Sequence, residues 1–108
     1  MSQNAFVYTE VQISVSFAEA PWKEVNAAIK SQPGFINKTW LSGVKTNSLG
    51  GIYTFDGVEN AQKFVTGYFP KEAGGFGAAH NTRIFDANTV KDASVDMGSP
   101  HFGVAPAP

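Results

Sequence analysis

The chain has 108 residues, of which 43% are hydrophobic and 13% aromatic, and it carries a formal net charge of −1 at pH 7. A chain of this length builds one domain, and so small a charge provides no basic field for nucleic acid or an anionic membrane. Cysteine is absent, which excludes disulfides, thiolate catalysis and cysteine-ligated zinc. No apolar run approaches the roughly 20 residues that span a bilayer, and the first residues lack a signal-peptide pattern, so we expect a cytoplasmic protein.

The first half of the chain predicts a strand, a helix and a hairpin. Residues 7–16 alternate strictly between apolar and polar side chains, as in a strand with one buried face. Pro21 suits the first turn of a helix, apolar residues then recur at helical spacing, and the Pro-Gly pair at 33–34 ends it. Residues 35–44 predict a second strand and residues 51–55 a third, with a polar turn between them.

The second half predicts a helix, a loop and a last strand. Asp56 stands where it can cap a helix whose apolar stripe runs over residues 58–69, and Pro70 is expected to stop that helix. The glycine-rich stretch 71–77 reads as a flexible loop, and residues 79–85 predict the fourth strand.

After Asn88 the composition turns small and polar. We therefore expect one domain over residues 1–90 and an extended tail over residues 91–108. The element order is β-α-β-β-α-β, which predicts a ferredoxin-like α+β fold with a four-stranded antiparallel sheet and two helices on one face.

The second and third strands carry large apolar side chains on both faces. Phe35 and Leu41 are expected on one face of the second strand, and Ile36 and Trp40 on the other. Helices cover only one face, so the other would leave an apolar patch in water. The economical cover is a second copy of the sheet, which predicts a homodimer that encloses a small-molecule cavity between the two sheets.

Three motifs carry a family resemblance. They read Pro33-Gly34-Phe35-x-x-Lys38-x-Trp40, Gly50-Gly51-Ile52-Tyr53-x-Phe55 and Ile84-Phe85-Asp86. In these motifs the chain resembles the YdhR-type mono-oxygenases, over residues 6 to about 90. The resemblance implies the dimeric α+β barrel fold. Relatives with that fold include cofactor-independent monooxygenases of quinone-forming antibiotic pathways, haem-degrading enzymes and lactone isomerases, so the fold alone does not decide the chemistry.

Trp40 and Tyr53 are the leading candidates for substrate binding, because aromatic side chains offer stacking surfaces to a planar substrate. The alternative for both is plain core packing, which aromatic residues also dominate. Lys38 shares a strand face with Trp40 and can hold an anionic or enolate oxygen if it points into the cavity. A lysine on a strand more often extends into water, which is the alternative here.

Further candidates lie on the first and fourth strands. His80 can act as a general base at the mouth of a pocket, and Arg83 can bind a carboxylate. Tyr8 and Glu10 lie on the polar face of the first strand, which is either solvated or the wall of the dimer cavity. In the second case Glu10 is the acid–base candidate of that strand and Tyr8 a substrate-binding residue. Solvent exposure is the alternative for His80 and Arg83 too.

Asn37 is the remaining substrate-binding candidate. A haem-degrading relative would use an Asn, a Trp and a His, and Asn37, Trp40 and His80 supply these residue types. Asn37 and Trp40 lie three apart on a strand, however, and so face opposite ways. With no cysteine and only His80 and His101, we predict no metal site, and we predict no bound cofactor.

The function predicted from these features is a cofactor-independent monooxygenase with a small aromatic or quinol-like substrate. His80 or Glu10 would deprotonate the substrate, whose anion would reduce oxygen, and Lys38, Arg83 or Tyr53 would stabilise the negative charge. A non-catalytic module that binds a small hydrophobic ligand, or an isomerase of the same fold, are the alternatives.

Overall fold

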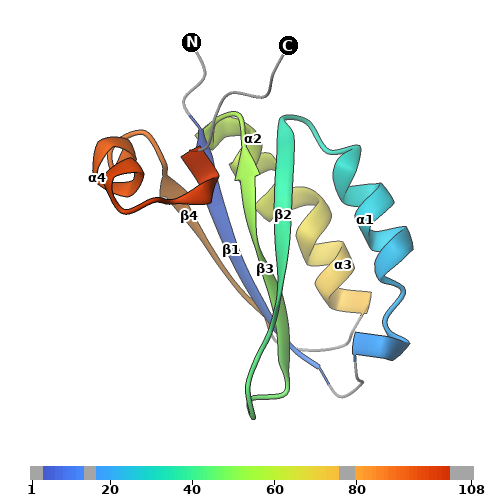
Figure 1. Cartoon of the computed structure of the whole chain (residues 1–108). Helices are drawn as coiled ribbons and strands as arrows, with labels where there is room; N and C mark the ends of the chain where they lie inside the picture. The colour runs from blue at the N-terminus through green and yellow to red at the C-terminus, as the bar shows by residue number, and fades with distance from the viewer. Residues whose placement is uncertain (1–3, 14–16, 76–79, 103–108) are drawn as a thin grey trace.

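The computed structural model describes residues 4–13, 17–75 and 80–102. An antiparallel sheet of four strands lies at its centre, in the order β2-β3-β1-β4 (Figure 1). The strands are β1 (Ala5–Gln12), β2 (Phe35–Ser42), β3 (Ser48–Phe55) and β4 (His80–Asp86). This order, with β1 in the middle beside both β3 and β4, is that of the predicted ferredoxin-like fold, which is confirmed.

The main helices lie on one face of the sheet, as Figure 1 shows for α1, α2 and α3. The helical segments are η1 (Phe17–Glu19), α1 (Trp22–Lys30), α2 (Val58–Lys63), η2 (Phe64–Tyr68), α3 (Phe69–Gly75), α4 (Lys91–Asp96) and η3 (Pro100–Phe102). None of the helices in the described part of the chain is both long and apolar enough to cross a membrane.

The second helical region continues through Pro70, and the prediction that this residue stops it is wrong. The π-helical turn η2 leads directly into α3, and Pro70 takes a place in the first turn of α3. The π-helical turn, in which the Phe69 N–H bonds the Phe64 carbonyl five residues back, interrupts the regular hydrogen-bond ladder, so a residue without an N–H is accepted directly after it. The predicted glycine-rich loop is therefore helical over residues 71–75, and the rest of it, up to residue 77, lies outside the described residues.

One smaller expectation also needs correction, and another is tested only in part. Asp56 does not cap α2: Gly57 holds the N-cap position, and the Asp56 carboxylate accepts a hydrogen bond of 2.7 Å from the Asn60 side chain instead. The first strand ends at Gln12, and the last residues predicted for it, 14–16, lie outside the described residues.

The C-terminal segment is folded where the structure describes it. The expected extended tail is wrong for α4 and η3, which are helical and follow one another beyond β4. Phe102 and His101 each place a ring centroid 5.5 Å from that of Phe6, so η3 packs against β1. A domain boundary after residue 90 stays a prediction.

A β-bulge in β2 decides which side chains face the helices. Phe35 pairs with Phe55 and Trp40 pairs with Gly51, with a register shift between Phe35 and Asn37. Because of the extra residue at Ile36, Phe35 and Trp40 share the helix-facing side. The prediction that they face opposite ways is wrong for this reason, since strict alternation cannot anticipate a bulge.

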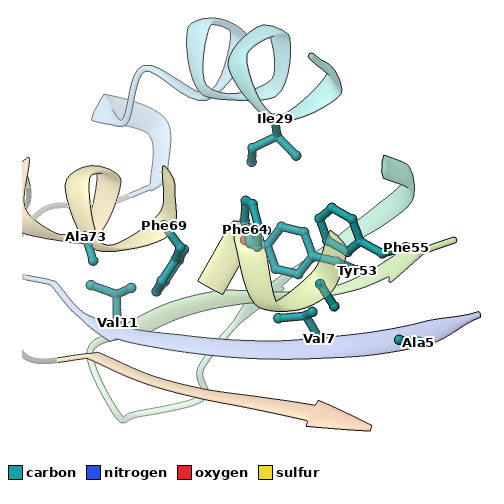
Figure 2. Close-up of a cluster of buried hydrophobic side chains, with 10 residues drawn as sticks. Ala5, Val7, Val11, Ile29, Tyr53, Phe55, Phe64, Phe69 and Ala73 are labelled. Atoms are coloured by element: carbon teal, nitrogen blue, oxygen red, sulfur yellow. The ribbon is translucent and has the colours of Figure 1, made fainter. Parts of the chain in front are cut away.

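The core fills the space between the sheet and the helices (Figure 2). Strands β1 and β3 supply Val7, Val11, Tyr53 and Phe55, and the helices supply Ile29, Ala61, Phe64, Phe69 and Ala73. Phe64 lies at its centre, with its ring centroid 4.9 Å from that of Tyr53 and 5.1 Å from that of Phe55. Tyr53 thus belongs to the packed core as well as to the candidate site.

Candidate functional site

Strand β2 directs Lys38 towards the interior between the sheet and the helices. Lys38 pairs with Tyr53 on β3 and is half-buried. Its Nζ lies 3.2 Å from the centroid of the Trp40 ring and 4.7 Å from that of Tyr53, so the ammonium group packs on two aromatic faces. Lys38 therefore does not extend into solvent, which was the alternative for this residue.

Glycine at position 51 makes room for this lysine. A Cβ atom on Gly51 would lie 2.6 Å from Cε of Lys38, which is shorter than any normal van der Waals contact between two carbon atoms. Gly51 of the third strand therefore allows the Lys38 side chain to lie flat against the sheet. Gly51 thus makes room for the Lys38 side chain, and Gly50 allows close approach to the backbone of Thr9.

Glu72 of α3 is the acidic counterpart of Lys38. Burial lowers the pKa of Lys38 to about 8, and the negative charge of Glu72 opposes this shift. Burial likewise raises the pKa of the Glu72 carboxyl, and the Lys38 ammonium opposes it. Among the described residues, Oε1 of Glu72 is buried without a hydrogen-bond partner. An amine with a lowered pKa and a carboxyl with a raised pKa, enclosed together, are suited to proton transfer.

Two tyrosines remain protonated beside this pair. Burial raises the pKa of Tyr53 far above its ordinary value, while its hydroxyl accepts a hydrogen bond of 3.4 Å from Thr9. Burial and the charge of Glu72 raise the pKa of Tyr68 to about 12. Both phenols therefore act as hydrogen-bond donors or acceptors and not as anions at neutral pH.

The cavity beside Lys38 is narrow. Thr9, Val11, Phe69 and Glu72 line it together with the aromatic residues already described. Its volume of about 10 Å³ accommodates about one water molecule. A larger ligand must displace a side chain. Lys38 and Trp40 lie between this cavity and a surface groove between α1 and β2, so they are the groups that would move.

Trp40 is held in place from α1. Its indole Nε1 donates a hydrogen bond of 2.9 Å to Oδ1 of Asn26, and the Phe17 ring packs edge-on with its centroid 5.4 Å away. The strand therefore supplies Trp40, and the helix fixes the plane of its ring.

Tyr8, Glu10 and Arg83 lie on the other face of the sheet. Tyr8 and Glu10 alternate with the buried residues of β1, and Arg83 pairs with Tyr8 across β4. The Tyr8 hydroxyl donates a hydrogen bond of 3.2 Å to Glu10. The sheet thus separates these residues from Lys38, and one chain does not bring the two groups together.

His80 and Asn37 lie at the edges of the sheet. His80 begins β4 on the helix-facing side and is exposed, with its ring centroid 5.4 Å from that of Phe69. Asn37 is exposed and pairs with Thr54, on the opposite side of the sheet from Trp40, so no Asn–Trp–His cluster for haem assembles. Within the described ranges no group of three or more His, Cys, Asp or Glu could hold a metal ion.

Glu72 and Tyr68 are site residues that the sequence interpretation missed. They are four residues apart, so they share one face of a helix that continues through Pro70. The expected end of that helix at Pro70 places Glu72 in a loop, so the sequence alone does not bring Glu72 to Lys38. The four-residue spacing of Tyr68 and Glu72 is a signal in the sequence, but it is informative only if the helix continues through Pro70.

Gly51→Ala is expected to displace Lys38 without unfolding the protein. The new methyl group collides with Cε of Lys38, which is part of a flexible side chain that can move aside into solvent. The pKa of Lys38 should then rise from about 8 towards 10.5, as an NMR titration of the lysine side chain measures.

Gly50→Ala provides the contrast. A Cβ atom on Gly50 meets the backbone carbonyl of Thr9, which cannot swing away, so this change should lower stability through the sheet. An unchanged Lys38 pKa in the Gly51→Ala variant would contradict the packing described for this site.

The chain thus has a ferredoxin-like fold with a lysine–carboxyl pair enclosed between its sheet and helices. A family model described as "Putative mono-oxygenase ydhR" matches residues 6–97, and the chain belongs to this family. No curated protein matches the chain.

Solved structures show the same fold at low identity. A variant of SnoaB, a cofactor-independent oxygenase from Streptomyces nogalater, is 19% identical with a TM-score of 0.58, over 80% of this chain and 94% of that one. A putative monooxygenase from Shewanella loihica PV-4 is 18% identical with a TM-score of 0.52, over 79% and 94% of the two chains.

Proposed function

We propose that this protein is a cofactor-independent monooxygenase that acts on a small aromatic or quinol-like substrate. The observation that carries the proposal is the enclosed cluster of Lys38, Trp40, Tyr53 and Glu72, which joins an ammonium group, a carboxyl group and two aromatic faces. The family and the fold shared with a cofactor-independent oxygenase support it.

Each group has a role in the proposal. Trp40 stacks against the substrate ring, and the Lys38 ammonium holds the oxygen on which negative charge develops. Tyr53 remains protonated and limits the space beside that oxygen. Glu72 removes the substrate proton, because Glu10 lies across the sheet from Lys38 and His80 lies at the exposed edge.

The reaction converts a ring CH₂ group, which lies opposite a ring carbonyl in the keto form of a phenol, and O₂ into a second carbonyl group and water. Glu72 takes one C–H proton, and the resulting carbanion transfers two electrons to O₂ in single steps while a C–O bond forms. The peroxide takes the proton back from Glu72. Loss of the second C–H proton then breaks the O–O bond, which leaves the carbonyl and releases water. The substrate supplies all the electrons.

Oxygen consumption by the purified protein tests this function. A panel of hydroquinones, naphthols and phenols with an activated CH₂ group is supplied without flavin or metal. We expect oxygen uptake in proportion to product with at least one member. Conversion of an unsaturated lactone without oxygen uptake would favour an isomerase, and tight binding without turnover would favour a ligand-binding module.

A homodimer remains part of the proposal. The face of the sheet away from the helices carries the exposed Phe85 together with Ile52, Leu41 and Tyr8, and η3 packs on it at Phe6. A second copy would remove this apolar surface from water. Sedimentation at micromolar concentration should show a dimer, and a monomer would contradict the proposed homodimer.

We also propose that the protein is located in the cytoplasm, which cell fractionation would test.

A further inference from the structure

A groove of about 290 Å³ opens between α1 and β2, outside the narrow cavity. Ile29, Phe35 and Ile36 give it apolar walls, and Asn26 and Asn37 also line it. Its volume is close to the lower limit of about 300 Å³ for small-molecule pockets in general, so it suits one or two aromatic rings.

The groove is positively charged. Lys30 of α1 and Lys38 of β2 line it, and among the described residues no carboxylate does. Apolar walls with cationic groups favour a planar ring that bears one anionic oxygen over a neutral aliphatic ligand.

Lys38 and Trp40 line both the groove and the narrow cavity. The ammonium group lies on the indole face, so the stacked pair stands between the two spaces. A ligand in the groove therefore meets the same lysine and the same ring as a ligand in the cavity. Movement of either side chain would join the spaces.

The bulge in β2 shapes the wall of this groove. It turns Phe35 inward onto Phe55, with 5.9 Å between the ring centroids, and leaves Ile36 48% exposed. Bulges often re-aim side chains next to active sites, and this one places an apolar side chain on the wall of the groove.

We propose that the groove between α1 and β2 is where the aromatic substrate first binds, with its ring against Trp40 and Ile36 and its anionic oxygen towards Lys38. Movement of these side chains then admits it to the cavity that holds Glu72. The identity of the ligand as a substrate rests on the proposed function. The binding site itself rests on the groove, its two lysines and its continuity with the cavity.

Thiol protection tests this binding site with a ligand that is not oxidised, 4-nitrophenolate. The chain has no cysteine, so Ile36→Cys creates a single thiol on the groove wall. Val44→Cys is the matched control, because Val44 is 82% exposed and borders the hollow beside Tyr8 and Glu10 on the other face of the sheet. Maleimide modification of each variant is followed by intact mass, and quenching of tryptophan fluorescence gives the Kd of the probe.

At ten times its Kd, the probe should slow modification of the Ile36→Cys variant about tenfold by mass action, and leave the Val44→Cys variant unchanged. Equal rates at Ile36→Cys with and without the probe would overturn the inference, as would protection at Val44→Cys alone or no measurable binding. Protection without oxygen uptake on any substrate would leave the groove in place and remove the oxygenase. Oxygen uptake without protection would remove the groove as the binding site and leave the oxygenase in place.

Discussion

Replacing Lys38 with methionine is expected to lower kcat/KM for oxygen-dependent turnover at least about a hundredfold while the protein stays folded. Removing one preorganised group that stabilises developing negative charge generally costs about 10² to 10³ in rate. Methionine keeps most of the apolar stem that packs on Trp40 and Tyr53, so only the charge is lost. Steady-state kinetics and circular dichroism measure the two parts of this prediction.

Lys38→Arg is the control for charge, since arginine stays protonated at every accessible pH. It should retain more activity than Lys38→Met, although the longer guanidinium group has little room beside Gly51. Wild-type turnover by Lys38→Met would remove this lysine from the mechanism.

The same lysine should limit the activity at alkaline pH. Its pKa of about 8 lies below the ordinary value of 10.5, so the ammonium group loses its proton as the pH rises through 8. kcat/KM should therefore fall above about pH 8 in the wild type. The Lys38→Arg variant should lack this fall.

Folding stability changes in the opposite direction over the same window. The unfolded chain binds this proton more tightly, so protonated Lys38 costs stability below pH 8 and the cost disappears between about 8 and 10.5. The contribution of Lys38 to the free energy of unfolding thus becomes more favourable as the pH rises. Urea unfolding of the wild type and Lys38→Met at several pH values compares these contributions.

Phe64→Ala is expected to destabilise the fold by about 3 to 5 kcal/mol, the usual cost of removing a core phenylalanine. The Phe64 ring is 1% exposed and contacts the rings of Tyr53, Phe55 and Phe69. Its loss leaves a cavity at the centre of the packing between β3 and the helices. Urea unfolding measures the change.

Val95→Ala is the matched control, because Val95 is 51% exposed on α4 and the change should stay within about 0.5 kcal/mol. A loss of less than about 1 kcal/mol for Phe64→Ala would show that the core collapses to fill the space or is not packed as described.

The fold followed from the sequence because alternation and helical spacing are local signals. Strict alternation through Val7 and Val11 identified β1, and the order of elements then left the ferredoxin-like sheet as the simplest arrangement. The motif around Lys38 and Trp40 likewise identified the strand that carries the site.

The remaining features depend on non-local structure. The π-helical turn before Pro70 carries the helix onward and brings Glu72 opposite Lys38, and no periodicity in the sequence marks it. The bulge at Ile36 similarly re-aims Phe35. The helix α4 was missed because its short, polar sequence lacks an apolar stripe and a side-chain cap, signals on which helix prediction depends.

Incorporation of ¹⁸O from labelled O₂ tests the proposed chemistry most directly. The purified protein, without flavin or metal, is given the substrate that shows the fastest oxygen uptake, and the product is analysed by mass spectrometry. We predict one labelled oxygen atom per product molecule with the wild type, and at least about a hundredfold less labelled product per unit time with Lys38→Met. Product without the label, or equal labelling rates in the two proteins, would contradict an oxygenase site at the Lys38 cluster.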